Sequence, residues 1–305
     1  MEEFRINNQT PPVCLTIAGV DPSGGAGVIA DIKTFTAFGC YAAAAVASLT
    51  FQNTQGVFGA ESQTAETVRR QIEPVLDDCT VAAVKTGMLP TREIIEEVAR
   101  LVERHALPNF VVDPVVRSTS GFDLIDDAAL RSLIEKLFPL AAIVTPNLPE
   151  AERIAGMKIE TPAEIEKAAR LMQSMGARSV VIKGGHRPIS DFRFWILDSA
   201  EDQTNASAEA DLSDAERQET GDERKALDFL YVGERRHVFA ADFVETRATH
   251  GTGCTFAAAI AANLALGQSL VDAVGTAKRF VTAAIRTAPA IGRGHSPINH
   301  LVREF

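Results

Sequence analysis

The sequence has few aromatic residues and no surplus of positive charge. Only 6% of its 305 residues are aromatic, with one Trp and two Tyr, whereas 46% are hydrophobic. The net charge of -10 at pH 7 argues against nucleic acid or an anionic membrane surface as a partner. No apolar stretch reaches membrane-spanning length without a polar interruption, and residues 1–12 lack the apolar core of a secretory signal. These absences argue against nucleic-acid binding, membrane insertion and secretion.

Cysteine is also scarce and unpaired in pattern. The four cysteines, Cys14, Cys40, Cys79 and Cys254, form no C-x-x-C motif and no cluster with histidine at zinc-ligand spacing. We therefore expect a reducing, cytoplasmic location. The negative charge is uneven, because residues 198–225 hold ten acidic and three basic residues. That segment carries a net charge of -7 and leaves -3 for the rest, so an anionic substrate is compatible with the charge.

Short apolar runs alternate regularly with amphipathic segments along the chain. This alternation is typical of parallel strands joined by helices that cover both faces of a sheet. The expected strands are 13–18, 41–50, 81–86, 110–114, 141–145 and 179–183, followed by shorter ones at 192–197, 229–232 and 236–240. The expected helices are 28–38, 66–76, 92–104, 128–137, 162–175, 254–266 and 271–288.

One segment interrupts this pattern. Residues at about 198–225 are rich in Ala, Ser, Asp, Glu and Gln, with almost no large apolar side chain. Such a segment cannot bury enough surface to offset the entropy lost on ordering, so we expect a disordered acidic insertion. The rest of 13–305 is expected to form a single α/β domain, preceded by a flexible N-terminus at 1–12.

A glycine-rich motif at 249–254 stands directly before the alanine-rich helix expected at 254–266. Gly251 and Gly253 allow a tight turn, and Thr252 lies between them. The first N–H groups of a helix have no intrahelical partner and attract a phosphate or a developing oxyanion. Cys254 lies in the first turn, where we expect the pKa of its thiol to fall. Alone, the motif is equally compatible with a tight helix entry and a buried cysteine.

Polar residues follow the expected strands at their carboxyl ends, where parallel sheets bind ligands. Asn147 and Glu150 suit a helix cap, but with Asp113 they could also hold a hydrated Mg²⁺. Lys183 could reach nucleotide phosphates or form a solvated strand end. Gln52 offers the donors and acceptor that an aminopyrimidine edge needs. The loop at 21–27 fits neither dinucleotide-binding nor P-loop spacing.

Seven blocks together resemble one family. Residues 15–27, 52–54, 85–88, 113–115, 145–151, 183–186 and 249–254 are similar, in this order, to the hydroxymethylpyrimidine/phosphomethylpyrimidine kinases of thiamine biosynthesis. The resemblance implies a ribokinase-like fold, a three-layer α/β/α sandwich with a mostly parallel central sheet. It implies that ATP phosphorylates 4-amino-5-hydroxymethyl-2-methylpyrimidine to its monophosphate and then to its diphosphate. It also implies a homodimer.

The resemblance assigns roles to individual residues. The pyrimidine would be bound by Gln52, Gly19, Ala26, Asp31, Met88 and Val115. The nucleotide and phosphates would be served by Lys183, Asn147, Glu150 and Asp113, with Mg²⁺ held by Asp113 and Glu150 through water. The catalytic anion hole would be formed by Gly251, Thr252, Gly253 and Cys254.

Three alternatives remain open from the sequence. A pyridoxal or pyridoxine kinase shares the fold and the motifs. A regulatory module that binds the pyrimidine without catalysis is disfavoured, because the chain keeps the polar site residues Asp113, Asn147, Glu150, Lys183 and Cys254. A cysteine hydrolase built on Cys254 lacks an evident orienting acid and base.

Overall fold

The computed structural model describes residues 10–116, 124–185 and 225–305. Within these ranges nine strands form one sheet in the order β3-β2-β1-β4-β5-β6-β7-β8-β9. The strand expected at 192–197, residues 1–9 of the N-terminus and almost all of the acidic insertion lie outside the described residues. The last residue of that expected insertion, Lys225, is the first residue of β8.

The centre of the sheet is parallel and its margins are antiparallel. Neighbouring strands are parallel from β2 through β1, β4, β5 and β6 to β7, whereas β3, β8 and β9 join by antiparallel pairing. The strands are β1 (Val13–Val20), β2 (Tyr41–Asn53), β3 (Gly56–Ser62), β4 (Val81–Thr86), β5 (Phe110–Val112), β6 (Ile143–Val144), β7 (Ser179–Lys183), β8 (Lys225–Val232) and β9 (Arg235–Asp242).

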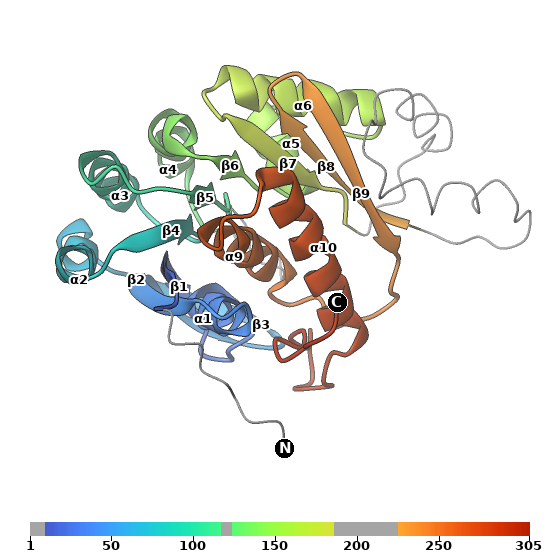
Figure 1. The fold of residues 1–305 in the computed structure, drawn as a ribbon, viewed down its shortest axis with the longest axis horizontal. Coiled ribbons are helices and arrows are strands. Elements are labelled where there is room, and N and C mark those ends of the chain that lie inside the picture. The colour runs from blue at the N-terminus through green and yellow to red at the C-terminus, as the bar shows by residue number, and fades with distance from the viewer. Residues whose placement is uncertain (1–9, 117–123, 186–224) are drawn as a thin grey trace, which may run out of the picture.

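Helices cover both faces of this sheet. Figure 1 shows α2 to α6 on one side and α1, α9 and α10 on the other. They are α1 (Gly27–Ala37), α2 (Ala65–Asp78), α3 (Arg92–Arg104), α4 (Asp127–Ser132), α5 (Leu148–Ala155), α6 (Pro162–Ser174), α9 (Thr252–Ala265) and α10 (Leu270–Arg286). The expected three-layer α/β/α sandwich with a mostly parallel sheet is therefore confirmed.

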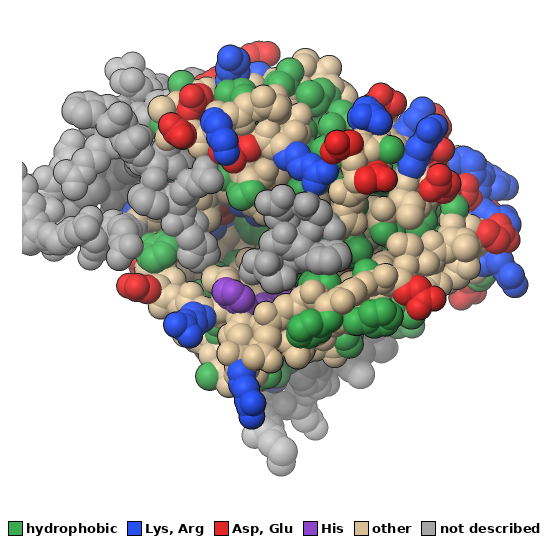
Figure 2. Space-filling view, turned by 180° about the vertical axis from the view of Figure 1, so that it is seen from behind, with side chains coloured by type: hydrophobic (Ala, Val, Ile, Leu, Met, Phe, Trp, Pro, Cys, Tyr) green, Lys and Arg blue, Asp and Glu red, His purple; other side chains and the backbone are tan. Residues whose placement is uncertain are grey.

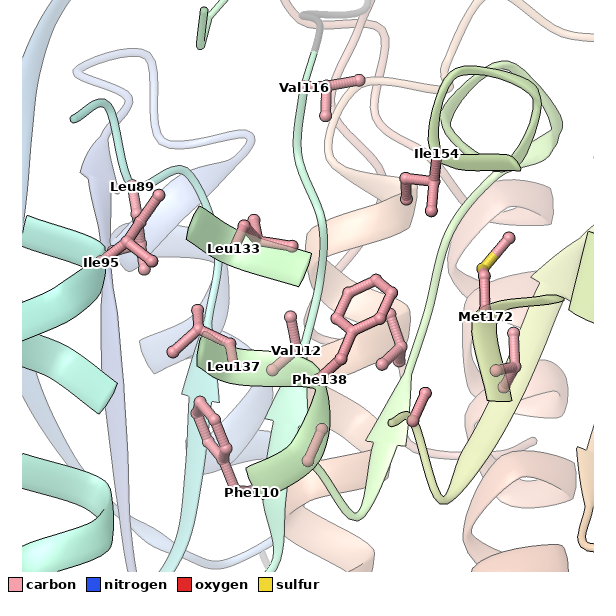
Figure 3. Packing of buried hydrophobic residues seen from close by; sticks show 14 of the residues in the cluster. Leu89, Ile95, Phe110, Val112, Val116, Leu133, Leu137, Phe138, Ile154 and Met172 are labelled. Carbon is pink, nitrogen blue, oxygen red and sulfur yellow. The ribbon is translucent and has the colours of Figure 1, made fainter. Parts of the chain in front are cut away.

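The two hydrophobic layers follow from the alternation of side chains along each strand. In β5, Phe110 and Val112 belong to the core beneath α2 to α6, whereas Val111 belongs to the core beneath α1, α9 and α10. Figure 3 shows Phe110 and Val112 packed with Leu137 and Phe138 from the irregular turns after α4. Because both faces are covered, the central strands are mostly apolar, as expected for buried parallel strands.

Three local expectations need correction. The strand β3 was not expected, because its Gly56 and Gly59 break the alternation and its pairing depends on β2. The helix expected at 128–137 consists of α4, a π-helical turn (Leu133–Leu137) and a 3₁₀ turn (Phe138–Leu140). The helix α5 was not among the expected helices, although Asn147 and Glu150 form the cap that their spacing suggested.

Charges of both signs are paired on the outer helices. Figure 2 shows them gathered over the side of the molecule that carries α2 and α3. Arg69 contacts Glu66 within α2, and Arg100 contacts Glu97 within α3, both at 2.6 Å. Exposed pairs of this kind contribute little stability each. None of the helices in the described ranges is long and apolar enough to span a membrane.

Candidate active site

A cavity of about 1230 Å³ opens at the carboxyl ends of the parallel strands, between the sheet and the first turn of α9. Thirteen of the fourteen predicted site residues line it, Gly251 among them. They are Gly19, Ala26, Gln52, Met88, Asp113, Val115, Asn147, Glu150, Lys183, Gly251, Thr252, Gly253 and Cys254. One predicted residue, Asp31, does not line the cavity. The chain thus brings together segments more than 200 residues apart at one edge of the sheet.

The anion-hole end of the cavity depends on Gly251. This residue adopts φ +82°, and a Cβ atom there would collide with the carbonyl oxygen of Gly25. Only glycine accepts both conditions. Among the described residues no side chain caps α9, whose first turn lines the cavity. The positive end of the helix dipole therefore lies at the cavity, as binding of a phosphoryl group requires.

The thiol of Cys254 differs from the expectation. Its position in the first turn predicts a lowered pKa, but burial raises the pKa of Cys254 to about 11. Lys85 and the backbone N–H of Gly27 act in the opposite direction without outweighing burial. Loss of hydration destabilises a thiolate more than one helix end stabilises it. At neutral pH, Cys254 is an uncharged thiol.

A cluster of acidic and basic groups lies beside that helix end. Lys183 Nζ contacts Asp113 Oδ1 at 3.2 Å, and Thr145 donates to the same oxygen at 3.1 Å. A Cβ atom on Gly253 would lie 3.3 Å from Lys183 Nζ, so the ammonium reaches the start of α9. Burial alone would lower the pKa of Lys183, but Asp113 and Glu150 together raise it. Lys183 is therefore a fixed positive charge at the phosphate end of the cavity.

Glu150 and Asn147 form a reciprocal capping box at the start of α5. The Asn147 side chain accepts from the Glu150 N–H at 2.9 Å, and Glu150 Oε2 accepts from the Asn147 N–H at 2.8 Å. Burial raises the pKa of Glu150 to about 7. Asn147 and Glu150 therefore cap α5, as their spacing suggested, and both residues also line the cavity. No cluster of three or more metal-binding side chains occurs within the described ranges.

Asp21, a residue without a role in the sequence-based assignment, lines the cavity beside the 249–254 motif. Its carboxylate accepts hydrogen bonds from the N–H groups of Gly25 and Ala26 at 3.1 and 2.8 Å. It also contacts His250 Nε2 at 2.7 Å. Although burial opposes ionisation, hydrogen bonds from His250, Ser23 and Gln52 hold the pKa of Asp21 well below its usual range. Asp21 therefore joins the glycine-rich loop to the 249–254 motif.

Gln52 and Met88 also line the cavity. Gln52 is near the end of β2 and its side chain bonds to Asp21, which fixes the amide at the cavity wall. A Cβ atom at Gly19 would lie 3.2 Å from the Met88 sulfur, so the glycine leaves room for the methionine. A flat, partly apolar wall with one oriented amide suits a small aromatic ring.

Asp31 corrects the sequence-based assignment. It is fully buried in α1, where it contacts Lys85 Nζ at 2.9 Å and accepts from Thr16 Oγ1 at 2.6 Å. Its place on the inner face of α1 follows from the helical spacing that also buries Val28 and Phe35. Its partner Lys85 comes from β4, and no local sequence pattern predicts that the two residues pair. Asp31 therefore belongs to the interior behind the site.

A second ion pair that the sequence did not predict lines the cavity next to Lys183. Lys278 of α10 contacts Asp228 of β8 at 2.9 Å, and both line the cavity. Asp228 is in register with Lys183, so their side chains share one face of the sheet. The charged wall thus continues from the phosphate end into the cavity between β8 and α10.

A helix start at the cavity, a fixed lysine and two buried carboxylates, set at the strand ends of a three-layer α/β/α sandwich, are the features that a phosphotransferase site needs. A sequence profile described as phosphomethylpyrimidine kinase matches residues 21–299. The chain belongs to this family.

Curated relatives are similar over most of the chain. A hydroxymethylpyrimidine/phosphomethylpyrimidine kinase of Staphylococcus aureus is 38% identical over 95% of this chain and 94% of its own length. The thiamine biosynthesis bifunctional protein ThiED of Geobacter sulfurreducens is 40% identical over 94% of this chain. The match spans only 52% of ThiED, so this chain corresponds to about half of that protein.

Solved structures agree in fold. An ADP complex of Bacillus subtilis pyridoxal kinase has a TM-score of 0.77 and 34% identity, and the match covers 95% of this chain and 97% of that one. A phosphomethylpyrimidine kinase from Clostridium difficile 630 has a TM-score of 0.69 and 34% identity, over 90% and 99% of the two chains. The ribokinase-like expectation therefore holds for the fold and the family.

Proposed function

We propose that this protein uses ATP to phosphorylate 4-amino-5-hydroxymethyl-2-methylpyrimidine and then phosphorylates the monophosphate to the diphosphate, for thiamine diphosphate biosynthesis. The observation that carries the proposal is one cavity with a ring-binding wall at Gln52 and an anion hole at 251–254. The family membership and the relatives' names support the same activity.

The nucleotide is assigned to the side of the cavity that carries Lys183. Lys183 would neutralise charge on the transferred phosphoryl group, because phosphoryl transfer needs mainly alignment and charge stabilisation. Asp113 and Glu150 would hold Mg²⁺ through water, with Asn147 orienting Glu150. Two carboxylates with few further protein ligands fit Mg²⁺, which keeps waters and substrate phosphates in its shell. When bound, Mg²⁺ would neutralise phosphate charge and help to align the nucleotide.

Cys254 would allow the pyrimidine monophosphate, the acceptor of the second step, to bind without electrostatic repulsion. That acceptor is itself a phosphate, so a carboxylate at position 254 would face a like charge. Two unit charges about 4 Å apart interact by about 4 kcal/mol at an effective dielectric constant near 20. Because burial keeps Cys254 uncharged at neutral pH, the thiol avoids this repulsion and leaves the N–H groups of α9 free for the phosphate. A Cys254→Asp variant that ran the second step as fast as the first would contradict this role.

The direct test is an assay of ATP conversion to ADP in the presence of Mg²⁺. The acceptors are hydroxymethylpyrimidine, its monophosphate and pyridoxal, with products identified by mass. We expect two successive phosphate additions to the pyrimidine, and loss of both with Gln52→Ala. Omission of Mg²⁺ with excess chelator should abolish turnover. No ADP from any acceptor would instead favour a module that binds the pyrimidine without catalysis.

Pyridoxal is the competing acceptor because several similar solved structures are named as pyridoxal kinases. Turnover of pyridoxal alone would assign the chain to vitamin B6 salvage. Trapping of Cys254 by iodoacetamide without ATP consumption would favour a cysteine hydrolase, although His250 bonds to Asp21 and is thereby engaged.

We also propose a homodimer and a cytoplasmic location. The hairpin of β2 and β3 exposes Leu49, Phe51 and Phe58, the last with 71% of its surface accessible. An edge strand with exposed large apolar residues favours association. All four cysteines are free thiols, which suits a reducing compartment. Light scattering of Phe58→Lys against the parent protein tests the dimer, and cell fractionation tests the location.

A further inference from the structure

The segment that follows α10, residues 289–300, forms no helix or strand; its first half is mostly exposed, whereas residues 296–298 and 300 are buried. We call it the C-terminal strap. Ser296, Ile298 and His300 have exposed fractions of 9%, 2% and 5%. The Ser296 hydroxyl contacts the carbonyl oxygens of Pro289 and Pro297 within the strap. Asn299 donates its N–H to Ala284 of α10 at 3.0 Å. A tail held this closely has a fixed path over the surface that it crosses.

The first contact of the strap is with the turn between β2 and β3. Thr54 lies in this turn, two residues after Gln52. Its carbonyl oxygen accepts from the His295 N–H at 2.7 Å, and its hydroxyl accepts from the Gly294 N–H at 3.3 Å. A Cβ atom at Gly292 or Gly294 would collide with Thr54, so the strap lies directly against the turn.

The second contact is with the anion-hole motif. The His250 N–H donates to the Ser296 carbonyl oxygen at 3.3 Å, and His250 and Pro297 form a parallel bridge. Further on, His300 Nε2 lies 2.9 Å from the hydroxyl of Thr255, the residue after Cys254. Both groups of this last bond are buried, so its loss would leave a buried polar atom without a partner.

We propose that the C-terminal strap is a positioning element that holds the Gln52 turn at a fixed distance from the Cys254 helix, with Thr54 and His300 as its positioning residues. The inference rests on the proposed function, in which Gln52 orients the acceptor and the start of α9 receives the phosphate. Neither Thr54 nor His300 lines the cavity, so each acts through its neighbour. Transfer requires the acceptor oxygen and the γ-phosphate in line, and a displacement of about 1 Å can reduce the rate about 100-fold.

The experiment compares matched substitutions at each end of the strap. Thr54→Val and His300→Phe keep the shape of the side chain and remove the hydrogen-bonding atom. Thr54→Ser and His300→Gln keep a hydrogen-bonding group. Leu301→Ala, next to the strap at a residue that is 83% exposed, is the control. For each variant, kcat and KM are measured for both acceptor and ATP, together with ADP formed per phosphorylated product.

We expect Thr54→Val and His300→Phe to lower kcat about tenfold or more, since alignment is lost while the nucleotide side is intact. The KM for ATP should change less than about twofold, and more than one ADP should form per product. Thr54→Ser, His300→Gln and Leu301→Ala should stay near the parent values. An equal loss in ATP and acceptor parameters with a lower Tm, or no loss in either variant, would overturn the proposal.

Hydrogen exchange of the substrate-free protein separates this proposal from the proposed function. In Thr54→Val, which leaves every core residue in place, we expect faster amide exchange in both 50–56 and 249–255, because one strap joins them. Unchanged exchange at 249–255 would overturn the strap's role whichever acceptor is phosphorylated. Faster exchange at both segments supports it even if the parent enzyme proves to phosphorylate pyridoxal.

Discussion

Two buried aspartate–lysine pairs lie behind and beside the same helix start, and they differ in access. Asp31 and Lys85 are completely buried, with their charged groups 2.9 Å apart. The side chains of Asp113 and Lys183 are 2% and 12% exposed, and both line the cavity. The first pair is satisfied by the protein itself, whereas the second faces the space assigned to phosphate.

The difference lies in how the hydrogen bonds are distributed. Lys85 donates to both carboxylate oxygens of Asp31, at 3.0 and 2.9 Å. Lys183 donates to one oxygen of Asp113 at a longer 3.2 Å and lies against Gly253. A lysine ammonium has three donors, so Lys183 can bind a phosphate oxygen without leaving Asp113. We therefore expect the first pair to govern stability and the second to govern turnover.

Breaking the first pair should give the largest effect. Lys85→Met leaves Asp31 buried without its positive partner, and loss of one member of a buried pair lowers the free energy of unfolding by about 3–5 kcal/mol. Urea denaturation measures this loss. The double variant Asp31→Asn, Lys85→Met removes both charges and should regain at least half of it. A Lys85→Met protein as stable as the parent would show that the pair does not support the fold.

Breaking the second pair should reduce turnover instead. Lys183→Met removes a donor from the phosphate end, and loss of one such donor lowers kcat by about 10²–10³-fold. Steady-state kinetics with saturating ATP measure the effect. The free energy of unfolding should fall less than in Lys85→Met, because Asp113 and Lys183 line the cavity, whereas Asp31 and Lys85 are completely buried. If Lys183→Met lost only stability and kept its kcat, the contrast between the pairs would be wrong.

Cys254 offers a probe between the two pairs. Burial raises the pKa of its thiol to about 11, Lys85 counteracts this, and Asp113 adds to it. Because iodoacetamide reacts with the thiolate, labelling should be slow at pH 7 and rise with pH toward 11. At pH 9, Lys85→Met should slow labelling and Asp113→Asn should speed it, each about tenfold. Mass spectrometry identifies the labelled site, with Cys254→Ser as the blank. Rapid labelling at pH 7 would instead indicate that the pKa of the Cys254 thiol is lowered, as its position at the helix start alone predicts.

The sheet and the cavity edge could be predicted from local sequence. The apolar run at 110–112 predicts β5, and the polar residues after each run predict where the cavity opens. Gly251 predicts the tight helix entry that its φ of +82° requires. These features depend on neighbours in the chain, which a single sequence contains.

Features that depend on distant partners could not be predicted in this way. The assignment of Asp31 to the cavity was wrong because Lys85, 54 positions away, holds it in the interior. The pKa of Cys254 depends on how deeply α9 is buried, which the first turn alone does not determine. The strand β3 depends on β2 for its hydrogen bonds, and the His250 side chain depends on Asp21, 229 positions away, for its bond.

The smallest effect is expected at Asn147, which caps α5 next to the pair of Asp113 and Lys183. Asn147→Ala removes the oxygen that accepts from the Glu150 N–H at 2.9 Å, and loss of such a cap lowers the free energy of unfolding by about 1 kcal/mol. Asn147→Ser supplies another capping oxygen and should keep the stability within about 0.5 kcal/mol of the parent value. Both are measured by urea denaturation alongside kcat and the KM for ATP.

The serine variant then separates the two roles of Asn147. If Asn147 only caps α5, Asn147→Ser restores turnover together with stability, because Glu150 stays in place. If the amide also contacts the nucleotide or the hydrated Mg²⁺, stability returns while the KM for ATP stays raised, since the shorter serine does not reach the cavity as far. We expect the second result, because Asn147 lines the cavity as well as capping the helix, and its backbone N–H keeps Glu150 fixed in either variant. If Asn147→Ser recovered both the free energy of unfolding and the KM for ATP, Asn147 would serve stability alone, as Asp31 and Lys85 do.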